Sequence, residues 1–292
     1  MFDINLFALS GQLLIGLING SFYALLSLGL AIIFGLLRII NFAQGAMYML
    51  GAFCALLFLK WFGMSYWVAL FVVPFVVAVL GILIERFLIR PIANLDHLYS
   101  LLLTFGIALI LQGSFTHLFG SSGLPYSTPA ELKGGMKLPF MYLPNYRAWI
   151  IASSVVICGL TWYMIEKTKL GAYLRAGTEN PQLLQAFGIN VPLIITLTFA
   201  FGVGLAGFAG VLAAPVYSVA PDMGSNILIV VFAIVVIGGM GSIGGAIITG
   251  LLMGIIEGLT KYFYPEASAT VIFLVMMLVL IVKPAGLFGK EG

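Results

Sequence analysis

The sequence predicts an all-α fold, a polytopic transmembrane helical bundle with about eight or nine spans, and three observations support this prediction. Of the 292 residues, 62% are hydrophobic and 8% are charged, whereas soluble domains carry roughly 25% charged residues. Apolar runs near the length of about 20 residues that a bilayer requires recur along the chain. Polar residues gather between these runs, and no soluble module interrupts them. We therefore expect one transmembrane domain over residues 1–292.

The apolar runs define the expected spans. They cover residues 7–35, 40–59, 66–88, 98–119, 148–165, 192–213, 226–240, 246–263 and 269–282. The join "FGLLRIINFAQGAMYML" contains Arg38, Asn41 and Gln44, and it can be interpreted either as two crossings or as one broken helix. Cys54 and Cys158 lie inside apolar runs, where free cysteine behaves as a small hydrophobic residue.

Basic residues predict the orientation in the cell inner membrane. With nine crossings and an external N-terminus, the C-terminus is cytoplasmic. Eight of the 13 Lys and Arg residues are then cytoplasmic and five external, which agrees with the positive-inside rule. On this topology residues 120–147 form the long external loop, in which Gly, Pro and Ser favour a folded cap with a short hairpin. Residues 166–190 form a cytoplasmic loop.

Several classes of function are excluded by what the sequence lacks. The formal net charge of +3 is small and dispersed, which argues against a nucleic-acid partner. His97 and His117 lie at span ends without other metal ligands at suitable spacing. No paired carboxylates or activated nucleophile can be identified, and no G-x-x-x-x-G-K-[ST] loop is present. We expect neither an enzyme active site nor a cofactor or metal in this chain.

The stretch "GAYLRAGTENPQLLQAFGIN" (171–190) is the most polar segment between two apolar runs. Asn180 can cap a helix, Pro181 fits its first position, and Gly188 can end it in the left-handed conformation. The spacing places Leu183, Leu184 and Phe187 on one side of this helix. A preceding short helix adds further candidates, namely Tyr173, Leu174 and Arg175. Such short helices must dock on something, and the residues alone leave open whether that is the bundle itself, the lipid interface or a partner's groove.

Several segments in a specific order carry a resemblance that covers nearly the whole chain. They include "NGSFYALLSLGLAIIFGLLRIINFAQGAMYMLGA" (19–52), "ERFLIRPI" (85–92), the stretch at 171–190, "VVIGGMGSIGGAIITGLLMGIIEGL" (235–259) and "KPAGLFGK" (283–290). The chain resembles the permease subunits of branched-chain amino acid ABC importers, the LivH type. Where members of that family commonly carry His and an acidic residue, this chain has Gln44 and Ala46, which leaves the substrate open.

The resemblance implies a function and a set of partners. The chain would be the permease of an ATP-driven importer for branched-chain or hydrophobic amino acids or a related small polar metabolite, and it would work by alternating access. Its partners would be two cytoplasmic ABC ATPase subunits, which bind the ATP, a second related permease of the LivM type or a copy of itself, and an extracytoplasmic substrate-binding protein. The residues that would couple to the ATPase are Tyr173, Leu174, Arg175, Glu179, Asn180, Pro181, Leu183, Leu184, Phe187 and Gly188.

Polar residues at membrane depth are candidates for the translocation path, although they can also bond between helices. These candidates are Arg38, Asn41, Gln44, Gln112 and Asn226. Glu257 is a lone carboxylate whose expected partner is Lys261 at i+4, and its role is open. Small residues at 202, 206 and 210 and at 250, 254 and 258 predict close helix packing, and "GGMGSIGG" (238–245) predicts a flexible break.

The alternative function is an ion-coupled secondary transporter. The spans contain few ionisable residues and show no visible inverted repeat, and both observations count against this alternative.

Overall fold

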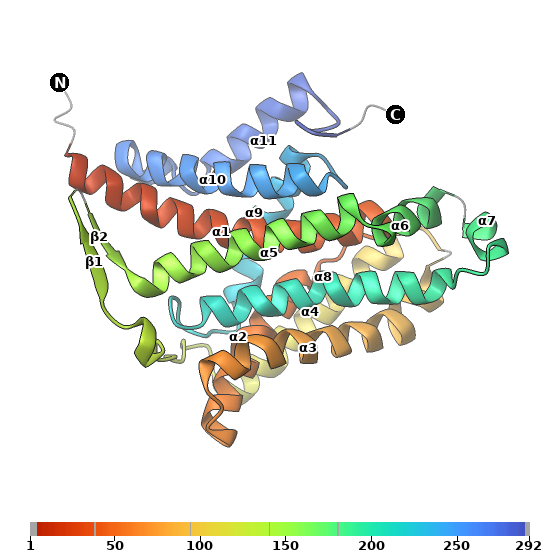
Figure 1. Ribbon diagram of the computed structural model, residues 1–292, viewed down its shortest axis with the longest axis horizontal. Helices are drawn as coiled ribbons and strands as arrows, with labels where there is room; N and C mark the ends of the chain where they lie inside the picture. Colours follow the sequence, from red (N-terminus) through yellow and green to blue (C-terminus); the bar gives the residue numbers. More distant parts are fainter. Residues whose placement is uncertain (1–4, 38, 94, 140, 180, 290–292) are drawn as a thin grey trace.

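The computed structural model describes residues 5–37, 39–93, 95–139, 141–179 and 181–289, and helices dominate these ranges (Figure 1). The α-helices are α1 (Leu6–Leu37), α2 (Ala43–Phe62), α3 (Tyr66–Ile84), α4 (His97–Phe119), α5 (Asn145–Lys167), α6 (Lys169–Glu179), α7 (Pro181–Ala186), α8 (Val191–Ala213), α9 (Met223–Gly238), α10 (Ile243–Phe263) and α11 (Val271–Val282). The predicted helical membrane bundle is therefore confirmed.

Every predicted apolar run corresponds to one helix. Within the described residues, seven helices are long and apolar enough to cross a membrane. The other two apolar helices, α9 and α11, have 16 and 12 residues, fewer than the roughly 20 of a perpendicular crossing. The break at "INFAQG" separates α1 from α2, so this join consists of two helices rather than one.

Close contacts at glycine hold α1 against α10. A Cβ atom placed on Gly254 would lie 2.3 Å from the carbonyl oxygen of Gly16, and one on Gly258 would lie 2.5 Å from that of Gln12. Because such distances leave no room for a side chain, the two backbones touch directly, as small-residue faces allow in membrane helices. The close packing predicted for this glycine face of α10 is confirmed.

A second small-residue face places α8 between α1 and α2. A Cβ atom on Gly202 would lie 2.9 Å from the carbonyl oxygen of Gly29 in α1, and one on Gly210 would lie 2.2 Å from that of Tyr48 in α2. Ala206, between these two glycines, is completely buried. The core of the bundle therefore lies where α1, α2 and α8 meet.

The long loop between α4 and α5 contains the predicted hairpin. Strands β1 (Gly135–Leu138) and β2 (Met141–Pro144) are antiparallel, with Met136 opposite Leu143. Earlier in the loop, Leu124 and Val219 exchange two backbone hydrogen bonds of 2.9 Å. The loop is thereby fixed to the segment between α8 and α9.

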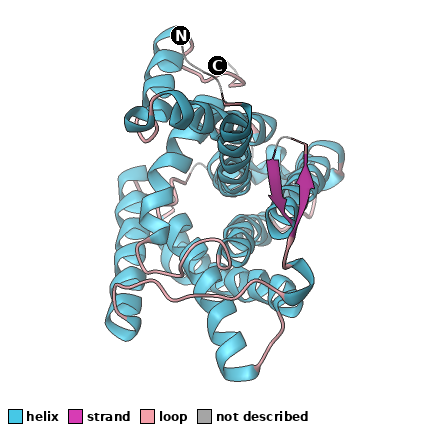
Figure 2. Cartoon of the chain, turned by 90° about the vertical axis from the view of Figure 1, so that its left-hand side faces the viewer, coloured by secondary structure: helices cyan, strands magenta, loops and turns pink. Residues whose placement is uncertain are grey.

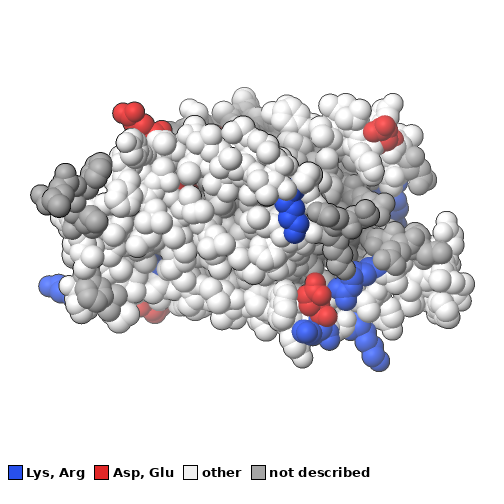
Figure 3. Space-filling view, turned by 90° about the horizontal axis from the view of Figure 1, so that it is seen from above, with Lys and Arg blue, Asp and Glu red and all other residues white. Residues whose placement is uncertain are grey.

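The hairpin and the α6–α7 pair lie at opposite ends of the bundle (Figure 1). Figure 2 looks along the helices from the hairpin end, where β1 and β2 lie beside the helix ends. On the face shown in Figure 3, most of the visible Lys and Arg side chains lie toward the α6–α7 end. On this face, basic side chains are therefore more numerous at the α6–α7 end than at the hairpin end.

The glycine-rich break between α9 and α10 is bonded to the C-terminal segment. Gly239 and Gly241 have positive φ angles of 97° and 90°, which side chains disfavour. The N–H groups of Leu287 and Phe288 donate to the carbonyls of Ile237 and Gly238 at 2.8 and 3.1 Å. The break that the sequence predicts as flexible is therefore held by the chain itself.

Candidate functional site

Helices α6 and α7 form the polar segment at one end of the bundle. α7 begins at Pro181 and is followed by Gly188, whose φ of 80° is left-handed. The N–H of Gly188 donates to the carbonyl of Gln185 at 2.9 Å, and that of Ile189 to the carbonyl of Leu184 at 3.3 Å. The predicted proline start and glycine end of this helix are confirmed. The predicted cap, Asn180, lies outside the described residues.

The structure divides the apolar side chains that the sequence places on one face of α7. Leu184 is only 7% exposed, whereas Phe187 is 75% exposed and Leu183 also faces outward. The reason is that α7 packs on α6 and α8: a Cβ atom on Gly177 would lie 3.4 Å from Leu184 and 3.9 Å from Val191. The prediction of one shared apolar face was wrong in this respect, because Leu184 anchors the helix to its own chain.

Helix α6 shows the same division. Leu174 is buried, whereas Tyr173 is exposed. The guanidinium of Arg175 lies 3.5 Å from the carboxylate of Glu166 in α5, and it donates to the carbonyl of Ile165 at 3.3 Å. Arg175 therefore fixes α6 to the end of α5. The side chains of Glu179 and Pro181 lie outside the part of the chain whose side chains are described.

An ion pair between a buried carboxylate, Glu85, and a partly exposed guanidinium, Arg90, was missed by the sequence reasoning. α3 continues through a π-helical turn, Glu85–Ile89, and a 3₁₀ turn, Arg90–Ile92. Glu85 is 2% exposed, and Arg90 donates to its two carboxylate oxygens at 3.2 and 3.1 Å. Thr196 of α8 donates to Glu85 at 2.7 Å. The pair of charges in "ERFLIRPI" was a signal, but an i,i+5 pairing falls outside the helical spacings normally searched.

The Asn41 and Gln44 side chains at the break before α2 bond to each other. The Asn41 amide donates to the Gln44 oxygen at 3.3 Å, and the Gln44 amide donates to the carbonyl of Gly202 at 3.0 Å. Both side chains are fully buried. The polar side chains at this break are therefore paired by hydrogen bonds inside the protein, as polar groups at membrane depth require. Arg38 lies outside the described residues.

The other predicted path residues line two different cavities. Gln112 of α4 borders a small cavity of about 70 Å³ next to Ala46 and Gly224. Asn226 of α9 borders a larger cavity of about 330 Å³, and its amide donates to Asp222 at 3.1 Å. The structure thus brings Asn41 and Gln44 together, but places Gln112 and Asn226 at separate sites.

The Glu257 carboxylate lies behind the larger cavity. The Asn19 amide donates to one of its oxygens at 3.2 Å, and the Tyr23 hydroxyl donates to the other at 2.7 Å. Among the described residues the ion pairs are Glu85–Arg90 and Glu166–Arg175. The predicted pairing of Glu257 with Lys261 was therefore wrong, because neighbours on α1 bind the carboxylate instead.

The larger cavity, which we call the polar pocket, lies between α1, α2, α9 and the segment before α9. Its lining residues are Asn19, Phe22, Tyr23, Tyr48, Tyr217, Ser218, Ala220, Asp222, Met223, Asn226, Ile227 and Val230. Tyr217 donates to Asn19 at 2.7 Å. Burial and the nearby Glu257 raise the pKa of Tyr217 to about 12, although Arg147 opposes this shift. Tyr217 is therefore a neutral hydrogen-bond donor at physiological pH.

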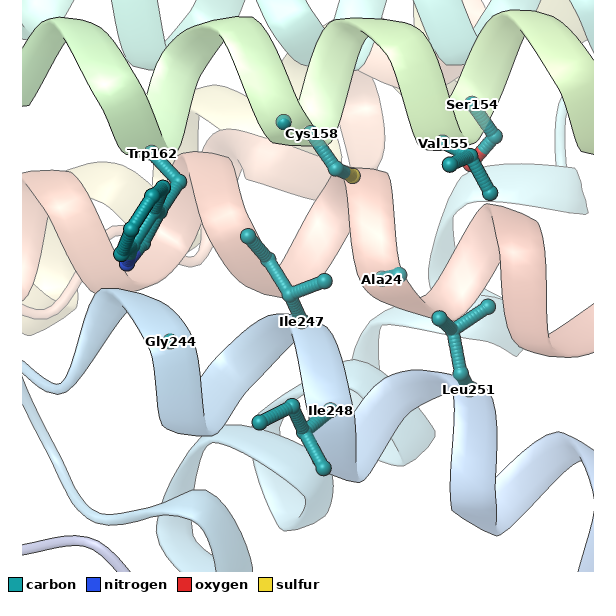
Figure 4. Close-up of a pocket in the computed structure, with 10 residues that line it drawn as sticks. Ala24, Ser154, Val155, Cys158, Trp162, Gly244, Ile247, Ile248 and Leu251 are labelled. Carbon is teal, nitrogen blue, oxygen red and sulfur yellow. The ribbon is translucent and has the colours of Figure 1, made fainter.

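A second cavity of about 280 Å³ lies between α5 and α10 over α1 (Figure 4). Trp162 and Cys158 of α5 face Ile247 and Leu251 of α10 across it. The Ser154 hydroxyl donates to the carbonyl of Ser21 at 3.0 Å. Most of the lining is apolar, and we call it the apolar pocket. It supplies no charged group of the kind that recognises a polar solute.

The amino-acid sequence is similar to those of known transport proteins. A family model described as "Branched-chain amino acid transport system / permease component" matches residues 12–282. The high-affinity branched-chain amino acid transport system permease protein LivH of Escherichia coli strain K12 is 32% identical, over 96% of this chain and 95% of the relative. No solved structure gives a significant match.

Two further relatives belong to the same kind of system. The permease protein BraD of Pseudomonas aeruginosa is 31% identical, over 96% of this chain and 95% of the relative. The permease protein LivM of Escherichia coli strain K12 is 28% identical, over 91% of this chain and 67% of the relative. The chain is thus similar to both permease proteins, LivH and LivM, of that bacterium.

Proposed function

This chain belongs to the branched-chain amino acid transport permease family, and we propose that it is the membrane-spanning permease subunit of an ATP-driven importer. Its substrate is a branched-chain or hydrophobic amino acid or a related small polar metabolite. The observation that carries the coupling role is the outward edge of α6 and α7, where Tyr173, Leu183 and Phe187 are exposed at one end of the bundle. An ion-coupled carrier is not favoured, because the relatives are permease components.

The exposed edge is suited to a groove on the ATPase. Exposed aromatic and aliphatic side chains on a short helix are the anchors of helix-in-groove recognition. Leu174 and Leu184 are buried and hold the two helices against the bundle. Arg175 and Glu179, which precede α7 in the sequence, would add one charge of each sign to the docking surface. Pro181 is the first residue of α7, and Gly188, with its left-handed φ, ends the turn after this helix. The ATPase subunits bind the ATP, and this chain holds no cofactor of its own.

Movement of α7 reaches the bundle through α8. The Asn190 side chain caps α8 by accepting a hydrogen bond from the N–H of Leu193 at 3.1 Å. Thr196, one turn further, bonds to the buried Glu85. α8 then packs directly on α1 and α2 through Gly202 and Gly210. A displacement of α7 by ATP-driven closure of the ATPases therefore tilts α8 against α1 and α2, which changes access to the path between the permeases.

The complex has a defined orientation in the inner membrane. The α6–α7 end and the C-terminus are cytoplasmic, and the N-terminus and the loop at 120–147 are external, in agreement with the positive-inside rule. The loaded extracytoplasmic binding protein docks on the external loop. Because both LivH and LivM of one bacterium align with this chain, its membrane partner is a second related permease or a copy of itself.

Affinity purification of the tagged full chain in mild detergent from its native host tests the assembly. We expect recovery of an ATPase and a second permease, followed by ATP-driven uptake after reconstitution. Phe187→Asp removes the ATPase from the purified complex, since it would bury a charge in the docking groove. Tyr264→Asp is the matched control, because Tyr264 is similarly exposed, at 69%, but follows α10 at the other end of the bundle.

The two variants separate the possible results. Loss of the ATPase in Phe187→Asp with retention in Tyr264→Asp supports docking at α7. Retained assembly and uptake in Phe187→Asp would refute the docking assignment. Recovery of the intact chain alone, with uptake that follows an ion gradient, would refute the importer.

A further inference from the structure

The polar pocket is lined by a tyrosine whose hydroxyl makes no hydrogen bond with the described residues. Tyr48 of α2 is 2% exposed and lines the pocket. No hydrogen bond of its hydroxyl is recorded among the described residues, whereas Tyr23 and Tyr217 in the same pocket each donate one. A hydroxyl can both donate and accept a hydrogen bond, and one that borders a cavity without a partner in the protein is available to a ligand there. This hydroxyl is the first indication that the pocket binds a solute.

The hydrogen bonds around the pocket are directed toward Glu257. Tyr217 donates to Asn19, Asn19 donates to Glu257, and Tyr23 donates to Glu257. An ionised carboxylate only accepts hydrogen bonds, so it fixes the direction of this chain. The Tyr23 and Tyr217 hydroxyls have used their only hydrogens, and their oxygens remain as acceptors. Asn19 keeps one further N–H.

The carboxylates at the pocket also favour a ligand that donates hydrogen bonds. Asp222 lines the pocket, and Glu257 lies directly behind Asn19 and Tyr23. No Lys or Arg is among the lining residues, and the ion pairs recorded in the described part do not involve either carboxylate. The positive charge of Arg147 lowers the pKa of Tyr217, but burial and Glu257 outweigh it. A carboxylate group entering the pocket would therefore meet two anions and mostly acceptor groups.

The remaining walls are apolar. Phe22, Ile227 and Val230 line the pocket beside the tyrosine rings, and a volume of about 330 Å³ is within the range of small-molecule sites. We propose that the polar pocket is a substrate site that binds the N–H end of a small solute, an ammonium or a carboxamide, with its apolar body against these walls. Glu257 is a positioning residue for Asn19 and Tyr23. This inference rests on the proposed transport function and narrows its substrate class.

Three probes of one shape test the inference. Isoamylamine, isovaleramide and isovalerate share a branched apolar body and differ in their head group. Their binding to the complete permease complex in lipid nanodiscs is measured by saturation-transfer NMR, with empty nanodiscs as the blank. We expect saturable binding of the amine or the amide, and isovalerate about tenfold weaker or absent, which corresponds to one lost charge-assisted hydrogen bond. The amine-to-amide ratio then distinguishes an ammonium from a neutral N–H donor.

Variants test the role of individual groups. Glu257→Gln removes the charge and introduces N–H donors opposite Asn19 and Tyr23, so the preference over isovalerate falls about tenfold. Tyr48→Phe keeps the ring and removes the free hydroxyl, and it weakens the preferred probe roughly fivefold. Cys158→Ala, in the apolar pocket, leaves all three affinities unchanged. Tyr48→Phe also keeps the test valid if Glu257→Gln does not fold.

Each outcome decides the question. Equal binding of isovalerate and isoamylamine to the unchanged complex would overturn the inference. A uniform loss of all probes in Glu257→Gln, with the preference retained, would show that this residue is only structural. Because recovery of the ATPase is measured separately, absence of probe binding with an intact complex would refute this site but not the proposed transport function.

Discussion

The α6–α7 half of the bundle and the half that contains the polar pocket each hold a carboxylate inside apolar helices, but their partners differ. Glu85 has a cation beside it, because Arg90 donates to its two oxygens. Within the described part of the chain, the donors to Glu257 are neutral, namely the Asn19 amide and the Tyr23 hydroxyl. A carboxylate paired with a cation leaves little field outside the pair, whereas one held by neutral donors still attracts positive charge.

This difference assigns two tasks to similar residues. Glu85, Arg90 and Thr196 tie the end of α3 to α8, below the helices that we propose bind the ATPase. Glu257 instead orients groups around a cavity. Ionisable groups inside a membrane protein are commonly functional. Glu85, which ties two helices together, has a cation as its partner, whereas Glu257, which orients groups around a cavity, has neutral partners.

The largest effect is expected when the Glu85 pair is broken. Arg90→Met leaves the Glu85 carboxylate buried without a cation, and it lowers the free energy of unfolding by roughly 3 kcal/mol, near the lower limit for broken buried pairs because part of Arg90 is exposed. Unfolding by SDS from lipid–detergent micelles measures the loss. In the double variant Glu85→Leu/Arg90→Met most of it returns. A single variant as stable as the unchanged chain would contradict the bracing role.

A smaller loss of stability is expected at Glu257. Glu257→Gln keeps the volume of the side chain and one acceptor, and it costs about 1.5 kcal/mol, since hydrogen bonds to charged groups are worth roughly 1.5–3 kcal/mol. The same SDS unfolding assay compares the two carboxylates directly. If this variant lost more stability than Arg90→Met, the contrast between the two carboxylates would fail.

Removal of the Tyr217 hydroxyl is expected to have a still smaller effect. Tyr217→Phe deletes one neutral hydrogen bond to Asn19 and costs about 1 kcal/mol. The pKa of Tyr217 is raised from 10.0 to about 12, so the folded chain keeps its proton longer than the unfolded chain. Its contribution is complete below pH 10 and falls between pH 10 and 12. Tyr217→Phe is therefore expected to lower the free energy of unfolding equally at pH 7 and pH 9. A smaller loss at pH 9 than at pH 7 would contradict the raised pKa of Tyr217.

The smallest effect on stability is expected at the exposed edge of α7. Phe187→Ala changes the free energy of unfolding by less than about 0.5 kcal/mol, because surface substitutions rarely do more. The same variant reduces recovery of the ATPase, which immunoblotting of the purified complex measures. Leu184→Ala is expected to do the opposite. It lowers the free energy of unfolding more than it reduces recovery of the ATPase, since the Leu184 side chain is buried and its truncation leaves a cavity. A large stability loss in Phe187→Ala would show that this side chain packs within the chain.

The sequence predicted the fold well because apolar run length and glycine spacing act locally. Each of the nine runs became a helix, and the glycines of α10 contact α1 as their spacing indicated. Pro181 and Gly188 defined the ends of α7 through backbone preferences that depend on single residues. Such signals need no knowledge of the tertiary structure.

The candidate site was less predictable because its partners are distant in sequence. Asn19 and Glu257 are separated by 238 positions, so the spacing on α10 suggested Lys261 instead. The Glu85–Arg90 pair uses a π-helical turn, which no local pattern indicates. Leu184 and Phe187 differ in burial because α7 lies against α6 and α8. These outcomes depend on how helices pack, which periodicity alone does not contain.

The most direct test of the account is photo-cross-linking from α7 within the assembled complex. A photoreactive phenylalanine analogue is placed at position 187 in one sample and at position 184 in another, and cross-links are identified by mass spectrometry in native membranes. We expect position 187 to cross-link the ATPase and position 184 to cross-link only this chain. Cross-links to the ATPase from position 184 alone, or to lipid alone from position 187, would contradict the proposal that the exposed edge of α7 couples the bundle to ATP hydrolysis.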